Sequence, residues 1–156
     1  MPFRRLWAKY VEDRYGCTLH ERECDLDLEP LTATQSEIEL IKYEMVRDEG
    51  YRVEEPILAF KGRYGGFFIV DGHTRARVIW DRGGRSIRTI LLTSPDAEVC
   101  ADLVRNAEEA GGGRTLRIWE VPVVDRLGRD TPAWAAKRQE LLDDWHKELA
   151  GRKEPL

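Results

Sequence analysis

The sequence predicts one domain of the α/β (α+β) class, because segments with helical periodicity alternate with short apolar segments typical of buried strands. At 156 residues the chain is long enough to bury a core without disulfides or a structural metal. No internal repeat, low-complexity tract or evident linker divides the sequence. We therefore expect residues 1–156 to fold as a single domain.

The first third of the chain is expected to form a helix, a strand and a second helix. Residues 3–15 show helical periodicity, and residues 23–28 alternate acidic with apolar side chains, as in a strand with its acids towards water. The second helix is expected over residues 34–49. Thr34 and Glu37 have the spacing of a capping box at its start.

The middle of the chain predicts a β-hairpin followed by a helix and a strand. Residues 57–60 and 67–70 are short apolar segments joined by a glycine-rich turn, which indicates a hairpin buried on at least one side. The helix that follows would end at the Gly83-Gly84 pair. Residues 89–92 then have the apolar pattern of a buried strand.

The C-terminal part, residues 96–150, is expected to be a largely helical extension. Helical patterns cover residues 96–110 and 132–150, and Pro132 suits the first turn of the second of these helices. Residues 116–124, between the two helices, are a candidate strand.

Residues 69–75, Ile-Val-Asp-Gly-His-Thr-Arg, carry the strongest functional signal, and we call them the box. They join the second hairpin strand directly to a helix, whose first backbone N–H groups and dipole attract anions. Gly72 would let a phosphate approach the backbone, and Arg75 could hold its oxygens. Asp71 is placed either to hold Mg²⁺ or a substrate hydroxyl, or simply to cap the helix. The box therefore predicts a phosphate site.

Three segments, in this order, resemble the ParB/sulfiredoxin-like superfamily, which includes the ParB-like nuclease domains. The box is similar to the signature of this superfamily, and residues 28–35 are similar to its Leu-x-Pro-Thr-Gln-type segment ahead of the first domain helix. Residues 56–60 resemble the strand that precedes the box. The resemblance covers about residues 23–94 and implies a compact domain with a small curved mixed sheet and surrounding helices.

The resemblance also implies a nucleotide-binding domain of the ATP/ADP type, with phosphoryl transfer or NTP hydrolysis as its activity. Mg²⁺ with ATP or ADP would be the cofactor, and a small hydroxyl compound a possible acceptor. The residues implied for nucleotide binding are Gly72, His73, Thr74, Arg75 and Thr34. Those implied for catalysis are Asp71, His73, Gln35 and Glu29, with Asp71 also implied as the metal ligand.

Gln35 departs from the pattern of the free serine kinases in this superfamily, which carry a catalytic glutamate at the comparable position. Glutamine cannot act as a base, although it can orient a nucleophile or bind a nucleobase. Either a nearby acid, Glu29 or Glu37, takes the role of the base, or the chain is not such a kinase.

Other activities of the superfamily are disfavoured by particular residues. Sulfiredoxins need a cysteine where His73 stands, and chromosome-partition ParB proteins carry Gly-Glu-Arg-Arg in place of residues 72–75. The residues after 95 are too few for the DNA-binding and dimerisation segments of those ParB proteins. A ParB-like DNA-binding or nuclease module is nevertheless the alternative, because arginines surround the box: Arg75, Arg77, Arg82, Arg85 and Arg88. A third possibility is a nucleotide-gated interaction domain without catalysis.

The composition limits the partners. The net charge of -4 and the pI near 5.5 argue against a general nucleic-acid coat, so DNA is a possible but not a favoured partner. The sequence lacks the apolar core of a signal peptide and any membrane-spanning segment, so we expect a cytoplasmic protein with no membrane partner. Its three cysteines, Cys17, Cys24 and Cys100, form no Cys-x-x-Cys pair and are expected to be reduced thiols.

Overall fold

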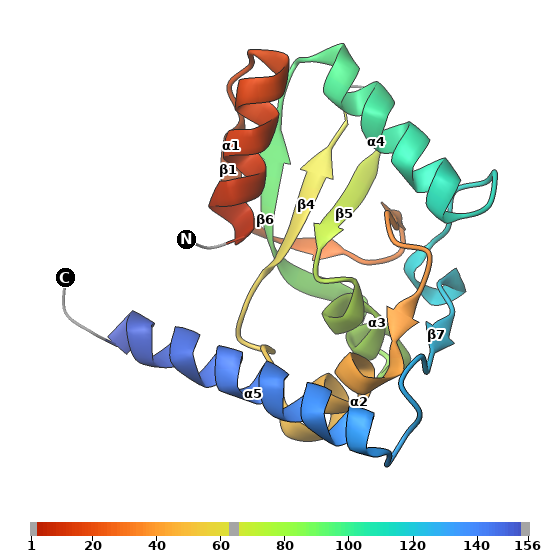
Figure 1. Cartoon of the computed structure of the whole chain (residues 1–156). Helices are drawn as coiled ribbons and strands as arrows, with labels where there is room; N and C mark the ends of the chain where they lie inside the picture. The colour runs from red at the N-terminus through yellow and green to blue at the C-terminus, as the bar shows by residue number, and fades with distance from the viewer. Residues whose placement is uncertain (1–2, 63–65, 154–156) are drawn as a thin grey trace.

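The expected hairpin lies at the centre of a five-stranded mixed sheet. The structure, a computed structural model, describes residues 3–62 and 66–153 (Figure 1). The strand order is β1-β6-β4-β5-β2, and the sheet is not closed. The strands are β1 (His20–Asp27), β2 (Leu31–Thr32), β4 (Ile57–Lys61), β5 (Phe67–Asp71) and β6 (Ser86–Thr93). The α+β class is thereby confirmed; residues 63–65 of the expected hairpin turn lie outside the described residues.

Alternation along the hairpin strands separates two hydrophobic clusters on opposite faces of the sheet. Leu58 and Phe60 pack with α1 (Phe3–Tyr15) and α4 (Ala97–Ala110) on one face. Ile57 and Ile69 pack on the other face with α3 (His73–Asp81) and the segment around β2. β4 pairs antiparallel with β5 and parallel with β6, which accounts for its nearly continuous burial.

A third cluster lies beyond the sheet and joins three helices: α2 (Leu40–Glu49), α3 (His73–Asp81) and α5 (Pro132–Lys153). Trp134 and Leu141 of α5 are buried in this cluster with Met45 of α2 and Val78 of α3. Figure 1 shows the long helix α5 running alongside α2 at the end of the molecule away from α4. Within the described ranges, no helix combines the length and apolarity that crossing a membrane would need.

The helix expected over residues 34–49 begins only at Leu40, and this part of the prediction is wrong. The proposed capping box does not form, because both of its side chains have distant partners. Thr34 donates to the carbonyl of Ile69, and Glu37 accepts from Arg126. The strand β3 (Ile38–Glu39) intervenes and pairs with β7 (Val123–Val124) in a second, two-stranded sheet.

The strand expected over residues 116–124 is also largely wrong. A 3-10 helix, η1 (Ile118–Glu120), and the short β7 occupy this segment. Arg77 of α3 donates to the carbonyls of Ile118 and Val121, so the segment is held by a side chain and not by a continuous strand partner. The other helices agree with expectation, including α4, where Asp96 caps two backbone N–H groups.

Candidate functional site

Gly72 makes the turn from β5 into α3 possible. Its φ is +106°, in the region that only glycine adopts readily. An added Cβ would lie 2.8 Å from the Cβ of Ile57, closer still to its Cγ2, and 3.0 Å from Nη2 of Arg75. The space beside Gly72 is therefore filled by the protein itself. The glycine is required by this packing and by its backbone conformation.

His73, at the first position of α3, is buried and connects the box to the segment before β3. Its Nε2 accepts a hydrogen bond of 2.9 Å from the backbone N–H of Thr34, whose hydroxyl donates to Ile69 O at 2.6 Å. Because Nε2 is an acceptor, the proton of the neutral imidazole lies on Nδ1. Among the described residues this buried Nδ1 has no hydrogen-bond partner.

Burial lowers the pKa of His73 from 6.5 to about 3, because the charged imidazolium is costly in an apolar environment. At neutral pH the ring is uncharged, so it acts as a hydrogen-bonding group and is poorly suited to the proton transfer expected for it. Its free Nδ1–H is a donor that lacks an acceptor.

The depressed pKa of His73 predicts a loss of stability in mild acid. Below pH 6.5 the unfolded chain takes up a proton that the folded ring does not accept until about pH 3. The neutral ring therefore makes its full contribution to the free energy of unfolding above about pH 6.5. This contribution falls by about 2 kcal/mol between pH 7 and pH 5. Urea unfolding at several pH values measures it. His73→Gln, which can still accept from Thr34 N–H, should remove this part of the pH dependence; an unchanged profile would contradict the assignment.

Arg75 is buried and already engaged within the fold. Its Nη1 donates to the carbonyls of Glu55 (2.7 Å) and Pro56 (3.2 Å), and its Nη2 lies 3.3 Å from Oδ2 of Asp71. Burial lowers the pKa of Arg75, whereas the carboxylates of Asp71 and Glu55 raise it. Arg75, which was expected to bind phosphate oxygens, thus links the box to the segment preceding β4 within the fold.

The open part of the box consists of the half-exposed Asp71 carboxylate and the first turn of α3. The first helical bond runs from Ala76 N–H to Gly72 O, so the N–H groups of the three preceding residues have no acceptor in the helix. Thr74 is partly exposed at this turn. Gln35 is exposed and directly follows Thr34, which contacts His73, so the structure brings the segment around Gln35 to the box.

Glu29 and Glu37, the two acids that could replace the missing catalytic glutamate, lie in different places relative to the box. Leu31 pairs with Phe67 at the start of β5, and Asp71 lies about 13 Å further along that strand. Glu29 precedes Leu31, so the structure does not bring it to the box. Glu37 forms an ion pair with Arg126, whose hydrogen bond lowers the pKa of Glu37.

Asp71 is paired with Arg75 and, among the residues that the structure describes, belongs to no preformed metal-binding cluster. Among the described residues, no group of three or more His, Cys, Asp or Glu side chains could hold a metal. Mg²⁺ commonly binds through one or two carboxylates and the phosphates of a nucleotide, keeping several waters. Asp71 fits this mode, in which the metal arrives with the nucleotide, and not a preformed protein cage.

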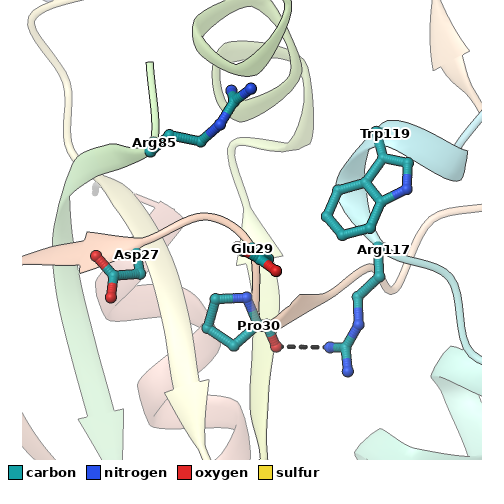
Figure 2. Close-up of a pocket in the computed structure, with 6 residues that line it drawn as sticks. All are labelled: Asp27, Glu29, Pro30, Arg85, Arg117 and Trp119. Carbon is teal, nitrogen blue, oxygen red and sulfur yellow. Dashed lines mark hydrogen bonds between the residues drawn. The ribbon is translucent and has the colours of Figure 1, made fainter. Parts of the chain in front are cut away.

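An open pocket of about 520 Å³ lies at the opposite end of α3 (Figure 2). Its lining residues are Asp27, Glu29, Pro30, Arg85, Arg117 and Trp119. Sequence reasoning missed Arg117 and Trp119, because it assigned their segment to a strand. The signal present in the sequence is a tryptophan, Trp119, that closely follows Arg114 and Arg117.

Comparisons with solved structures find a likeness in fold. No protein-family model and no curated protein matches the sequence. The chain is similar to the crystal structure of protein Atu1540 from Agrobacterium tumefaciens, with a TM-score of 0.53 and 11% sequence identity. The similarity covers 82% of this chain and 91% of that chain. At this identity the likeness concerns the fold alone.

Proposed function

We propose that this protein binds a nucleotide, with a phosphate group at the first turn of α3. The observation that carries the proposal is the convergence of acceptor-free backbone N–H groups with the half-exposed carboxylate of Asp71. The unpartnered Nδ1–H of buried His73 adds a further donor at the same helix start. The resemblance of the box to the ParB/sulfiredoxin-like signature points to the same ligand.

The two charged residues of the box have different tasks in this proposal. Asp71 would hold Mg²⁺, and the metal would supply positive charge to offset that of the phosphate. Arg75 orients Asp71 through Nη2 and places a positive charge behind the helix start, while its Nη1 stays on the backbone carbonyls. Backbone N–H groups, and not the guanidinium, supply the direct phosphate contacts.

The proposed chemistry is phosphoryl transfer to a small hydroxyl compound, or hydrolysis of the nucleotide. Such reactions depend mainly on positioning and charge neutralisation, which backbone donors and Mg²⁺ provide. Gln35 is exposed in the segment that Thr34 attaches to the box. It would orient the attacking hydroxyl or water through its amide, since it cannot take up the proton itself.

Asp71→Asn tests the proposal, because its expected effect on nucleotide affinity differs in direction with and without Mg²⁺. With Mg²⁺, we expect the Kd for ATP or ADP, measured by titration calorimetry, to rise at least about tenfold, because a charged ligand is lost. Without Mg²⁺ the variant should bind as well as the wild type or better, since one negative charge near the phosphates is gone. Asp143→Asn, at an exposed site on α5, is the matched control.

Two results would contradict the proposal. One is the absence of nucleotide binding by the folded wild type, and the other is an Asp71→Asn protein whose affinity does not change in Mg²⁺. Phosphate release from ATP, followed in the same samples, separates turnover from binding without chemistry.

The DNA-binding or nuclease alternative is a weaker proposal, because the arginines around the box have partners within the molecule. Arg77 pairs with Asp81, Arg88 with Glu23, and Arg82 donates to the carbonyl of Arg47. Each would have to exchange an internal partner for a DNA phosphate. With a net charge of -4, we expect only weak and strongly salt-dependent association with duplex DNA.

A further inference from the structure

The pocket at the far end of α3 combines an aromatic wall with charged groups of both signs. Trp119 of η1 is 38% exposed and lines the pocket. Its ring stacks on that of Trp80 at a centroid distance of 4.6 Å and an interplanar angle of 21°. The guanidinium carbon of Arg85 lies 3.8 Å from the centre of the Trp80 ring. Trp119 is therefore supported from behind by a second indole.

Both arginines of the pocket are anchored through one nitrogen to neutral oxygens. Nη1 of Arg117 donates to the carbonyl of Pro30 (2.6 Å) and to the hydroxyl of Thr32 (3.1 Å). Nη1 of Arg85 donates to the carbonyls of Gly84 (2.8 Å) and Trp80 (3.2 Å). In the part of the chain that the structure describes, neither forms a salt bridge. Arg117 keeps its remaining N–H donors for a ligand, whereas the guanidinium of Arg85 packs on the face of Trp80 that is turned away from Trp119.

Asp27 and Glu29 provide acceptors in the same pocket. Both side chains are exposed, and neither has a hydrogen-bond or ion-pair partner among residues 3–62 and 66–153. Figure 2 shows Arg85, Trp119 and Arg117 arranged around Glu29 and Pro30, with Asp27 on the side away from Trp119. Unpaired cations and anions thus lie within one hollow, next to an exposed aromatic ring.

We propose that this pocket is a second ligand site, for a flat ring that carries an acidic group and hydrogen-bond donors, as a nucleoside monophosphate does. The ring stacks on the open face of Trp119, the acidic group faces Arg117, and hydroxyl or amino groups donate to Asp27 and Glu29. The volume of about 520 Å³ accommodates one such molecule.

The site is separate from the box and does not depend on the function proposed there. Trp80 lies about 10 Å along the helix axis from His73, at the other end of α3. A nucleic-acid strand fits the pocket less well than a single small ligand. Asp27 and Glu29 sit inside the hollow, and Asp25 precedes them on β1, so a polyanion would be repelled.

Indole N–H signals in a ¹⁵N NMR spectrum test this site directly, because the chain has five tryptophans and Trp119→Phe identifies the signal of Trp119. Adenosine, guanosine, cytidine and uridine monophosphates, the free nucleosides and inorganic phosphate are the probes. We expect at least one monophosphate to shift the Trp119 signal at millimolar concentration, and its nucleoside or phosphate alone to bind less tightly.

Variants of the full chain locate the binding energy. Trp119→Ala should weaken monophosphate binding roughly five- to a hundredfold through lost stacking. Arg117→Gln should weaken it about tenfold. Arg88→Gln, at an exposed arginine outside the pocket, should leave the affinity unchanged. The persistence of the other indole signals shows that each variant is folded.

Three outcomes would overturn the proposal. They are a Trp119 signal that no monophosphate moves, an Arg117→Gln protein that binds like the wild type, and, with a short single-stranded oligonucleotide as a further probe, a response to the oligonucleotide alone. The last outcome would assign the pocket to a nucleic-acid strand. Failure here leaves the effect of Asp71→Asn on nucleotide affinity untouched, and failure at the box leaves the Trp119 response untouched.

Discussion

Replacing Gly72 by alanine is expected to lower the free energy of unfolding by about 2–5 kcal/mol. Two costs add together. A φ of +106° is unfavourable for a residue with a Cβ, and the new methyl group would overlap Ile57 at the start of β4. Ile57 is fully buried and cannot move aside without opening the core. Urea unfolding measures the loss.

Gly83→Ala separates the two costs. Gly83 also has a positive φ, +90°, but no atom lies within 4 Å of its would-be Cβ. It should therefore lose only the conformational part, about 1–2 kcal/mol. Equal losses in the two variants would mean that the packing of Ile57 against Gly72 has no energetic weight.

Arg75→Ala is expected to destabilise the fold by about 2–4 kcal/mol. The variant leaves the carbonyls of Glu55 and Pro56 without their donor and removes a buried side chain that joins two segments. Urea unfolding again supplies the measurement. Arg88→Ala is the matched control. It has an exposed side chain and one surface ion pair, and should change stability by less than about 1 kcal/mol. Equal small effects for both arginines would contradict the structural role of Arg75.

The internal bonds of Arg75 change what a loss of nucleotide affinity in Arg75→Ala would mean. The sequence alone predicts that Arg75 holds phosphate oxygens. The structure instead indicates a mainly structural role for Arg75, because its Nη1 and Nη2 groups are already bonded inside the protein. A loss of nucleotide affinity in this variant would reflect a displaced Asp71 and a loosened start of β4. Asp71→Asn is the cleaner probe of the site.

The parts of the fold that were predicted correctly depend on local patterns. The hairpin strands, α1 and α4 follow from apolar periodicity and from Asp96 as a helix cap. The helix expected from residue 34 failed because Thr34 bonds to Ile69, 35 residues away, in place of its own backbone. No local pattern reveals such a partner.

The geometry of the candidate site, too, was predictable where it depends on local sequence and was missed where it depends on distant partners. That the box is a helix start directly after a strand follows from its sequence, and the structure confirms this location. The burial of Arg75 depends on carbonyls about twenty residues earlier, and the pocket at Trp119 depends on η1 packing beside Trp80. Both require the tertiary structure, because their partners are distant in sequence.

Backbone amide shifts in a ¹⁵N NMR titration with ATP or ADP and Mg²⁺ test the central proposal most directly, since they report on the N–H groups themselves. We expect the largest chemical-shift changes at the amides of His73, Thr74 and Arg75, and smaller changes at Thr34 and Gln35. In Asp71→Asn these shift changes should no longer depend on Mg²⁺. Amides of the first turn of α3 that do not move while nucleotide binds elsewhere, for example beside Trp119, would contradict the proposed phosphate site.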